Sequence, residues 1–347
     1  MNKNSDRVEY IDALRGFIMF LVVYHHVAYW GMDDLDLGYN ESFLKFLMPT
    51  FFFISGWLFY TNNRSWDKMT ILCIIKKKFM KLIIPFLFFM LLYMYQFNGP
   101  EYQTTFDSKY GFWYIYSLFQ FYIIYIVIEV VFNKEQSNKK EAGIIIFILA
   151  LSIFSFCYEI FRFEYDLGIW RKILTALSFS KIKFIIYFWI GTFAKKNYNS
   201  FIRLTDNQYV VAFCLGVFYL LAIHSSQIYH SNIIELRTIS FLLTGTTGCI
   251  FVYTLFRKNE VHFSKDTKIG KALQYIGQRT LDIYLLHYFV LPYHLPYIST
   301  WIAELNSKTV EMLIILILSL WILSLSLLLS CIIRLSPFLG HYLFGAK

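Results

Sequence analysis

Long apolar runs alternate with short charged segments along the whole chain. A helix of about 20 apolar residues crosses a bilayer core of about 30 Å, so each run of this kind predicts a transmembrane helix. The pattern therefore predicts an all-α, polytopic integral membrane protein with about ten transmembrane helices. The predicted spans are 11–30, 42–60, 79–97, 111–132, 143–160, 182–194, 208–224, 236–256, 280–298 and 310–333.

The positive charges predict the orientation of these spans. With a cytoplasmic N-terminus, the inner segments hold 21 of the 32 Lys and Arg residues, which satisfies the positive-inside rule and places both termini in the cytoplasm. Five basic residues between Arg162 and Lys183 depart from the pattern. Two interpretations stay open: the sixth span begins near Ile173 with Lys181 and Lys183 snorkelling outward, or this stretch lies in the outer interface.

The composition indicates that the chain is embedded in lipid, and it excludes several classes of function. Hydrophobic residues make up 57% of the 347-residue chain and charged residues only 16%. The net charge of +9 sits in loops between apolar runs, so nucleic acid is not an expected partner. No repeat or linker divides the sequence, which predicts one transmembrane domain over 1–347. The chain lacks phosphate-loop, GxSxG and HExxH motifs and metal-ligand spacing, so we expect no metal.

The first span carries the richest set of ionisable residues. Such groups are costly inside a membrane, by about 2.5–3.5 kcal/mol at the centre, and each is a candidate functional residue. Arg15 and His26 are eleven residues apart and share nearly one helix face, about 16 Å apart along the axis, with Asp12 within about 40° of it. His25 points about 100° away. The alternative is an interfacial Asp12–Arg15 pair with the histidines in the headgroup region.

Motifs in this span and in later ones resemble the acyltransferase-3 family of membrane acyltransferases. The opening motif is DALRG with Arg15, followed by His26. The resemblance covers most of the chain in the family's order. The further stretches are MPTFFFISGWLF (Met48–Phe59), KKKFMKLIIPF (Lys76–Phe86), FWYIYSLFQFY (Phe112–Tyr122) and IGQRTLDIYLLH (Ile276–His287).

The resemblance implies acyl transfer from acyl-CoA, mostly acetyl-CoA, to a hydroxyl of a carbohydrate. His26 is the expected base or nucleophile, because a neutral imidazole can serve as either near pH 7. Arg15 is expected to bind a phosphate or thioester oxygen of the donor, and Asp12 completes the predicted catalytic set. Lys78 and Lys81 stand where the family often has arginines and are predicted to bind CoA; the alternative is that they only set topology.

Further residues are predicted to bind substrate, some within the stretches that carry the resemblance and Glu129 from its depth in the fourth span. They are Trp113 and Tyr114 of the fourth helix, Glu129, and His287. Glu129 lies at roughly the depth of Arg15 and Lys81 and could neutralise one of them, or could be an ordinary interfacial carboxylate. His287 could equally be a packed core histidine. The basic loop 257–279 has the pattern of an in-plane amphipathic helix that anchors to anionic lipid or holds CoA phosphates.

The predicted function is a membrane-bound O-acyltransferase, most simply an O-acetyltransferase, in a bacterial inner membrane. Its expected partners are membrane lipid, a carbohydrate acceptor and polysaccharide-synthesis proteins. Two alternatives are an exporter of polysaccharide or lipid-linked sugar, for which the inverted repeats of transporters are missing from the sequence, and a scaffold for a synthase complex. No recognisable motif identifies the acceptor sugar, the acyl chain or the membrane face that the acceptor approaches.

Overall fold

The computed structural model describes residues 8–31, 43–96, 109–132, 138–162, 168–231, 233–291, 296–304 and 307–345. In these residues the chain forms helices and no strand, which confirms the all-helical prediction for this part. Among the described residues, five helices are long and apolar enough to cross a membrane, or seven if each of two bent pairs counts as one span. Parts of the predicted spans 42–60, 79–97 and 280–298 lie outside the described residues. The full count of ten and the cytoplasmic termini stay predictions.

The chain divides into two compact units, which we describe separately. Unit 1 consists of Met1–Ile54 and Asn199–Ile333, and unit 2 consists of Ser55–Tyr198 and Arg334–Lys347. The prediction of one transmembrane domain over the whole chain stays a prediction.

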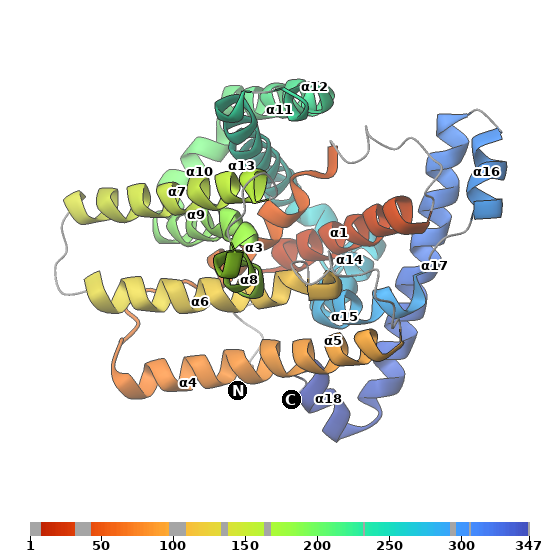
Figure 1. Ribbon diagram of the computed structural model, residues 1–347, viewed down its shortest axis with the longest axis horizontal. Coiled ribbons are helices and arrows are strands. Elements are labelled where there is room, and N and C mark those ends of the chain that lie inside the picture. Colours follow the sequence, from red (N-terminus) through yellow and green to blue (C-terminus); the bar gives the residue numbers. More distant parts are fainter. Residues whose placement is uncertain are drawn as a thin grey trace. The chain divides into compact units, whose positions relative to one another are not determined.

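Unit 1 is built around its first helix. Its elements are α1 (Glu9–His26), the π-helical turn η1 (Val27–Gly31), most of α3 (Leu47–Phe59), α10 (Tyr198–Asp206), α11 (Gln208–Ile223), α12 (Ser225–Tyr229), α13 (Ile234–Lys258), η6 (Glu260–Phe263), α14 (Lys268–Gln278), α15 (Thr280–Val290), α16 (Pro296–Glu304) and most of α17 (Lys308–Arg334). Figure 1 labels the α-helices of this unit along the ribbon.

Helices α1 and α14 pack with their backbones almost in contact. A Cβ atom on Gly16 would lie 1.9 Å from the carbonyl oxygen of Leu273, and one on Gly277 would lie 1.8 Å from that of Asp12. Small residues at a crossing allow such close approach in membrane proteins. The predicted basic helix within 257–279 is therefore present as α14, and it packs along the first half of α1.

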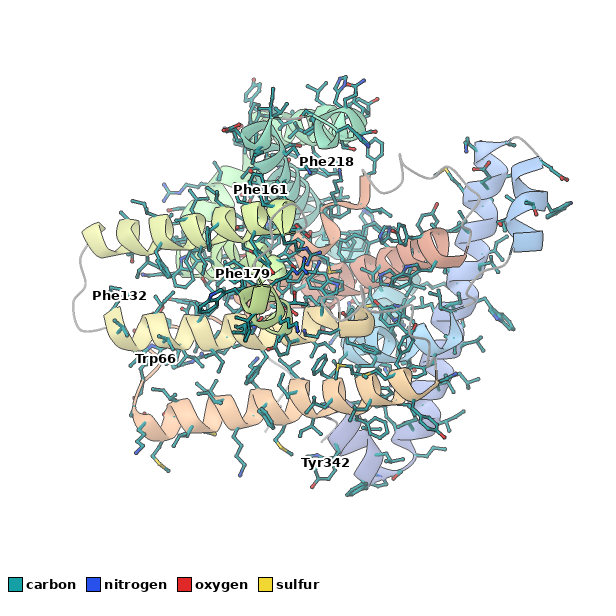
Figure 2. The ribbon with its side chains drawn as sticks, viewed as in Figure 1. Trp66, Phe132, Phe161, Phe179, Phe218 and Tyr342 are labelled. Carbon is teal, nitrogen blue, oxygen red and sulfur yellow. The ribbon has the colours of Figure 1, made fainter. Side chains whose placement is uncertain are left out.

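A second close packing in unit 1 joins α11 to α13. The ring of Phe218, labelled in Figure 2, lies over Gly248, where a Cβ would be 2.9 Å from two ring carbons. Tyr10 of α1 contacts Tyr253 of α13 through hydroxyl groups 3.2 Å apart. These contacts hold α1 in the centre of the unit, and 67% of its apolar window is buried.

The described residues of unit 2 form three long helical runs and a broken one. Its elements are the end of α3, α4 (Lys68–Lys78), η2 (Phe79–Ile83), α5 (Ile84–Gln96), η4 (Lys109–Gly111), α6 (Trp113–Phe132), α7 (Asn138–Phe161), α8 (Gly168–Ala176), η5 (Phe179–Phe184), α9 (Ile185–Lys196) and α18 (Pro337–Phe344). Helices α4 and α5 continue through η2 as one run (Figure 1). Helix α18 packs on α5 through Phe344 and Phe89, whose ring centroids are 6.1 Å apart.

The predicted sixth span is longer and more irregular than 182–194. It runs from Phe179 to Lys196, and α8 precedes it at an angle of 52°. Lys181 and Lys183 do not snorkel outward, because both contact Glu159 of α7. Helix α8 exposes Ile169 and Trp170, as a helix in a membrane interface would. The span thus starts before residue 182 but after Ile173, and a separate short helix precedes it; the position of this stretch relative to the membrane stays a prediction.

Candidate functional site

His26 and His287 form a hydrogen-bonded pair in unit 1. Nδ1 of His26, the last residue of α1, is 2.8 Å from Nε2 of His287 on α15, and the two rings are nearly parallel. His287 has no exposed surface, whereas His26 is partly exposed. The π-helical turn η1 begins directly after His26, and such turns in helices are frequent at functional sites. The pair therefore presents one accessible imidazole backed by a buried one.

A backbone carbonyl sets the proton positions of this pair. Nδ1 of His287 is 2.9 Å from the carbonyl oxygen of Ile283, which can only accept a hydrogen bond. In the neutral pair, His287 therefore carries its proton on Nδ1 and accepts through Nε2. Nδ1 of His26 must then donate, and this leaves a lone pair on Nε2 of His26. That nitrogen has the protonation state of a general base or nucleophile.

Aromatic rings surround His26 and limit its motion. Trp30 stacks on its ring at 4.7 Å between centroids, and the Tyr288 ring lies at 5.2 Å. His25 instead stacks on Tyr29 at 6.0 Å. Tyr29 is exposed, so the two neighbouring histidines face different surroundings, as the 100° rotation between them predicts.

Arg15 lies toward the other end of α1 and binds the start of α15. Its Nη2 atom donates to Oγ1 of Thr280 at 2.7 Å, and Nη1 is 3.5 Å from the Asp12 carboxylate. The rise along the helix puts about 16 Å between Arg15 and His26, so the two predicted catalytic residues do not share one contact site. The interfacial i,i+3 pair that the sequence allowed is present, at a long distance. Thr280 is a partner that the sequence did not single out.

Buried polar contacts hold α15 in place between the Arg15 end and the His26 end of α1. The Asp282 carboxylate, which is 1% exposed, accepts a hydrogen bond of 2.5 Å from the Ser330 hydroxyl of α17. Thr280, Asp282 and His287 are all buried, and each bonds to a different helix or to its own backbone. Helix α15 is thereby held in register with both α1 and α17.

In unit 2, Lys78 and Lys81 differ in what they contact. The Lys78 ammonium is 3.8 Å from the centroid of the Tyr122 ring and 5.1 Å from that of Phe59, a cation–π arrangement. Lys81 is exposed on η2, where its stem passes beside Gly345. Only Lys81 of this pair is thus directed away from the aromatic core of unit 2.

Trp113 and Tyr114 also have different neighbours. The Trp113 ring stacks on Phe184 at 5.4 Å, and the Lys181 ammonium lies 5.3 Å from its centroid. The Tyr114 hydroxyl is 3.1 Å from Oγ of Ser55. Trp113 therefore belongs to the surroundings of the broken span, and Tyr114 joins α6 to the end of α3.

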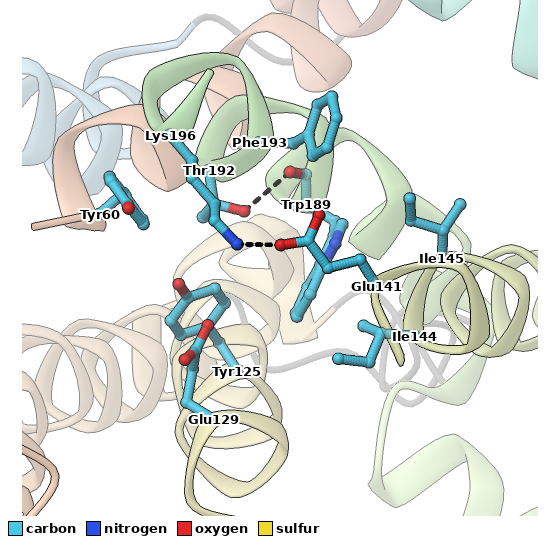
Figure 3. A pocket seen from close by; sticks show the side chains of 10 residues that line it. All are labelled: Tyr60, Tyr125, Glu129, Glu141, Ile144, Ile145, Trp189, Thr192, Phe193 and Lys196. Atoms are coloured by element: carbon cyan, nitrogen blue, oxygen red, sulfur yellow. Dashed lines mark hydrogen bonds and ion pairs between the residues drawn. The ribbon is translucent and has the colours of Figure 1, made fainter. Parts of the chain in front are cut away.

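Glu129 lines a cavity of about 60 Å³ in unit 2. Ligand sites typically hold about 300–1,000 Å³, so this cavity has room for a few water molecules but not for CoA. Glu129 lies beside Tyr125, and Arg64 is a cation within its electrostatic reach. Lys196 and Glu141 form an ion pair at the cavity wall (Figure 3). The remaining lining residues are Tyr60, Ile144, Ile145, Trp189, Thr192 and Phe193.

The structure groups the sequence-predicted residues into separate clusters. His26 and His287 meet, Arg15 and Asp12 meet, and Lys78, Lys81, Trp113, Tyr114 and Glu129 each have other neighbours within unit 2. Among the residues that the structure describes, no group of three or more His, Cys, Asp or Glu side chains could hold a metal ion.

Comparison with known proteins supports the same class of chemistry. No curated protein and no solved structure matches the chain. The profile of the acyltransferase-3 family, described as an acyltransferase domain, matches residues 8–333. This range includes His26, Arg15 and His287, and it covers nearly the whole sequence. The chain therefore belongs to the acyltransferase-3 family of membrane acyltransferases.

Proposed function

We propose that the protein is a membrane O-acyltransferase that moves an acyl group, most simply acetyl, from acyl-CoA to a hydroxyl of a carbohydrate. The hydrogen-bonded chain from the Ile283 carbonyl through His287 to His26 is the observation that carries this proposal. It supplies a fixed, partly exposed imidazole with a free lone pair, which acyl transfer to a hydroxyl needs.

In the proposed reaction, Nε2 of His26 takes the proton from the acceptor hydroxyl while that oxygen attacks the thioester carbonyl. The carbon–sulfur bond then breaks, and the CoA sulfur leaves with the proton that His26 returns. Nε2 of His287 accepts a hydrogen bond from Nδ1–H of His26 throughout and stabilises the imidazolium that forms on His26, because the Nδ1–H of His287 donates to the Ile283 carbonyl. His287 is in this scheme a positioning residue.

A covalent route uses the same atoms. Nε2 of His26 would attack the thioester carbonyl first, and the carbon–sulfur bond would break to release CoA thiolate and leave an acyl-histidine. The acceptor hydroxyl then attacks the acyl carbon, the carbon–nitrogen bond breaks to restore the imidazole, and the hydroxyl proton neutralises the thiolate. The two routes differ in kinetics, because only the second gives ping-pong behaviour and an acylated enzyme without acceptor. Rapid quenching of the protein with labelled acetyl-CoA alone distinguishes them.

The donor is proposed to bind through basic residues at the predicted cytoplasmic end of the spans. Arg15 has a planar guanidinium that suits a phosphate of the donor, and its bond to Thr280 orients it. The thioester oxygen is a less suitable partner, because Arg15 is about 16 Å along the helix from His26. Lys81 and the neighbouring Lys76 and Lys77 are exposed and can meet the CoA phosphates. Lys78 lies over the Tyr122 ring, so we assign it a smaller part in donor binding.

The proposed setting is a bacterial inner membrane, with ten spans and both termini in the cytoplasm. The positive-inside distribution supports this orientation. It puts Arg15 at the cytoplasmic end of α1 and His26 toward the outer end, so the donor is expected to extend along α1 with its phosphates near Arg15 and its thioester at His26. Polysaccharide-synthesis proteins are the proposed source of the acceptor.

Paired histidine variants test the function. His26→Ala is expected to lower glycan acylation by about 10²–10⁴-fold, the usual contribution of a general base. His25→Ala is the matched control, because it removes a neighbouring imidazole that stacks on Tyr29 instead, and it should retain most activity. Both are measured as ester content of the surface glycan and as acetyl-CoA consumption by the purified protein.

The same measurement also tests the alternative function as an exporter. An exporter would leave glycan acylation intact and reduce the amount of glycan on the surface. Wild-type ester content in folded His26→Ala protein would rule out the proposed acyltransferase mechanism.

A further inference from the structure

Helix α14 carries basic side chains on the side opposite its buried glycines. Lys268, Lys271 and Tyr275 are spaced so that they share one helix face, and all three are exposed. Gly270 and Gly277 are buried on the other side, where Gly277 packs against the backbone of α1. The basic side of α14 is therefore directed away from α1.

Arg279, the C-cap of α14, extends this row of side chains. Its guanidinium carbon lies 3.8 Å from the centroid of the Tyr275 ring, which is a cation–π contact. The Nε atom of Arg279 is buried and has no hydrogen-bond partner among the described residues. Arg279 also directly precedes Thr280, which accepts the hydrogen bond from Arg15. The row thus leads from the start of α14 to the residue that orients Arg15.

The cations of this row lack an acidic partner in the part of the chain that the structure describes. Lys268, Lys271 and Arg279 form no ion pair there. Of the acidic residues closest to them in the sequence, Asp266 is not ion-paired with any of them, and Asp282 is buried and bonds to α17. Like charges on one exposed side favour a bound anion. We call Lys268, Lys271, Tyr275 and Arg279 the α14 basic face.

We infer that the α14 basic face binds the nucleotide end of CoA, including its ribose phosphate. This inference rests on the proposed function and names further residues of its donor site. That function puts the CoA phosphates near Arg15, whose guanidinium also lies 3.5 Å from the Asp12 carboxylate. A diphosphate and a ribose phosphate carry more negative charge than Arg15 balances, and the α14 basic face supplies the remaining positive charge.

The types of side chain on this face fit a nucleotide. Arg279 can bind a phosphate with its planar fork, and Lys268 and Lys271 act as point charges. Tyr275 is 41% exposed and offers an aromatic surface on which adenine can stack. The phosphate of an anionic lipid shares only the charge with CoA, so the aromatic surface and the connection through Thr280 to Arg15 favour CoA.

Binding of CoA and of dephospho-CoA to the purified full-length protein in detergent tests this site. The two ligands differ only in the ribose phosphate, so the ratio of their affinities reports the contacts of that group. We expect wild-type protein to bind CoA about tenfold more tightly than dephospho-CoA, the effect of one charge-assisted contact.

Matched variants locate the contacts. Lys271→Gln and Arg279→Gln should each weaken CoA binding about tenfold and reduce its advantage over dephospho-CoA. Arg203→Gln is the control, because it removes an exposed cation of α10 in the predicted inner segment 195–207, and it should stay within about twofold of wild type. Lys271 is exposed and has no ion pair among the described residues, so its substitution is compatible with folding.

A lipid measurement separates the donor from a headgroup as the source of the phosphate. Retention of phosphatidylglycerol by the same proteins is followed by native mass spectrometry. We expect the wild type and both variants to retain this lipid equally. Variants that lose the lipid but bind CoA like wild type overturn the inference and identify the face as a lipid site.

The CoA titrations decide the inference independently of the proposed function. Equal wild-type affinity for CoA and dephospho-CoA overturns the site, and so does CoA affinity that neither variant lowers. Acyl transfer by the protein in either case leaves the proposed function standing. CoA binding that depends on Lys271 and Arg279, without acyl transfer to any acceptor, supports the site and overturns the function.

Discussion

The backbone contact between α1 and α14 makes a sharp prediction about Gly16 and Gly277. An alanine at either position would place its Cβ 1.9 or 1.8 Å from a carbonyl oxygen of the other helix. Carbon contacts are normally about 3.5–4.0 Å, so the two helices must separate by more than 1 Å to admit the methyl group. No flexible side chain can move aside, because both clashing atoms belong to the backbone.

The expected magnitude follows from two opposed effects. In an open helix position, Gly→Ala stabilises by about 0.5–1 kcal/mol through the unfolded chain. At a packed position, an added methyl typically costs about 1–3 kcal/mol. Gly143 of α7 and Gly216 of α11 have no heavy atom within 4 Å of an added Cβ, so they are matched controls. We therefore expect Gly16→Ala and Gly277→Ala to be about 2–4 kcal/mol less stable than these controls.

The same separation should disturb the Arg15 end of the site more than the His26 end. Gly16 is next to Arg15, and Gly277 lies three residues before Thr280, which Arg15 contacts. Denaturation midpoints followed by tryptophan fluorescence give the stability, and the KM for acetyl-CoA gives the functional effect. Equal midpoints for all four alanine variants would refute the claim that these helices touch through their backbones.

Three further outcomes are expected. His287→Leu should lower kcat by about 10²–10³-fold with little change in KM and should shift the pH profile of kcat, because the Nδ1–H group of His26 loses its acceptor; a variant that changes only thermal stability would contradict this role. Arg15→Ala should raise the KM for acetyl-CoA at least tenfold, with Thr280→Val giving a smaller rise, and an unchanged KM in both would move the donor site elsewhere. Hydrogen bonds from the Thr70 side chain and amide hold the pKa of Asp67, the N-cap of α4, well below its usual range. The cap therefore stabilises α4 fully above about pH 4, and less as the pH falls through the lowered pKa. Hydrogen exchange at the Met69 and Thr70 amides should show an effect of Asp67→Ala at pH 7 that shrinks in acid, and an effect that does not change with pH would contradict the assignment.

Hydrophobic pattern was sufficient to predict the long helices. The first, fourth, fifth, eighth and tenth predicted spans correspond to helices that are long and apolar enough to cross a membrane. The break at 176–179 was not predictable in this way, because it depends on Ser155 and Glu159 of another helix. Apolar pattern reports a residue's preference for lipid and says nothing of bends that a neighbouring helix stabilises.

The site shows the same division between local and long-range information. The helical spacing of Arg15 and His26 identified them within one helix. The pairing of His26 with His287 joins residues 261 positions apart, and only the motif IGQRTLDIYLLH drew attention to the second histidine. The direction of Lys78 toward the Tyr122 ring depends on packing between α4 and α6, which no spacing along the chain encodes.

The sequence separation of 261 positions between His26 and His287 also means that the two residues are synthesised at different times. At about 5–20 residues per second, the ribosome needs roughly 13–50 s to deliver α15 after α1 has emerged. During that interval α1 has neither the Thr280 hydroxyl for Arg15 nor the imidazole for His26. An insertion factor, a lipid headgroup or water must satisfy these groups first, so α1 depends on such a partner until α15 is inserted, and the His26–His287 pair of the proposed mechanism forms only then.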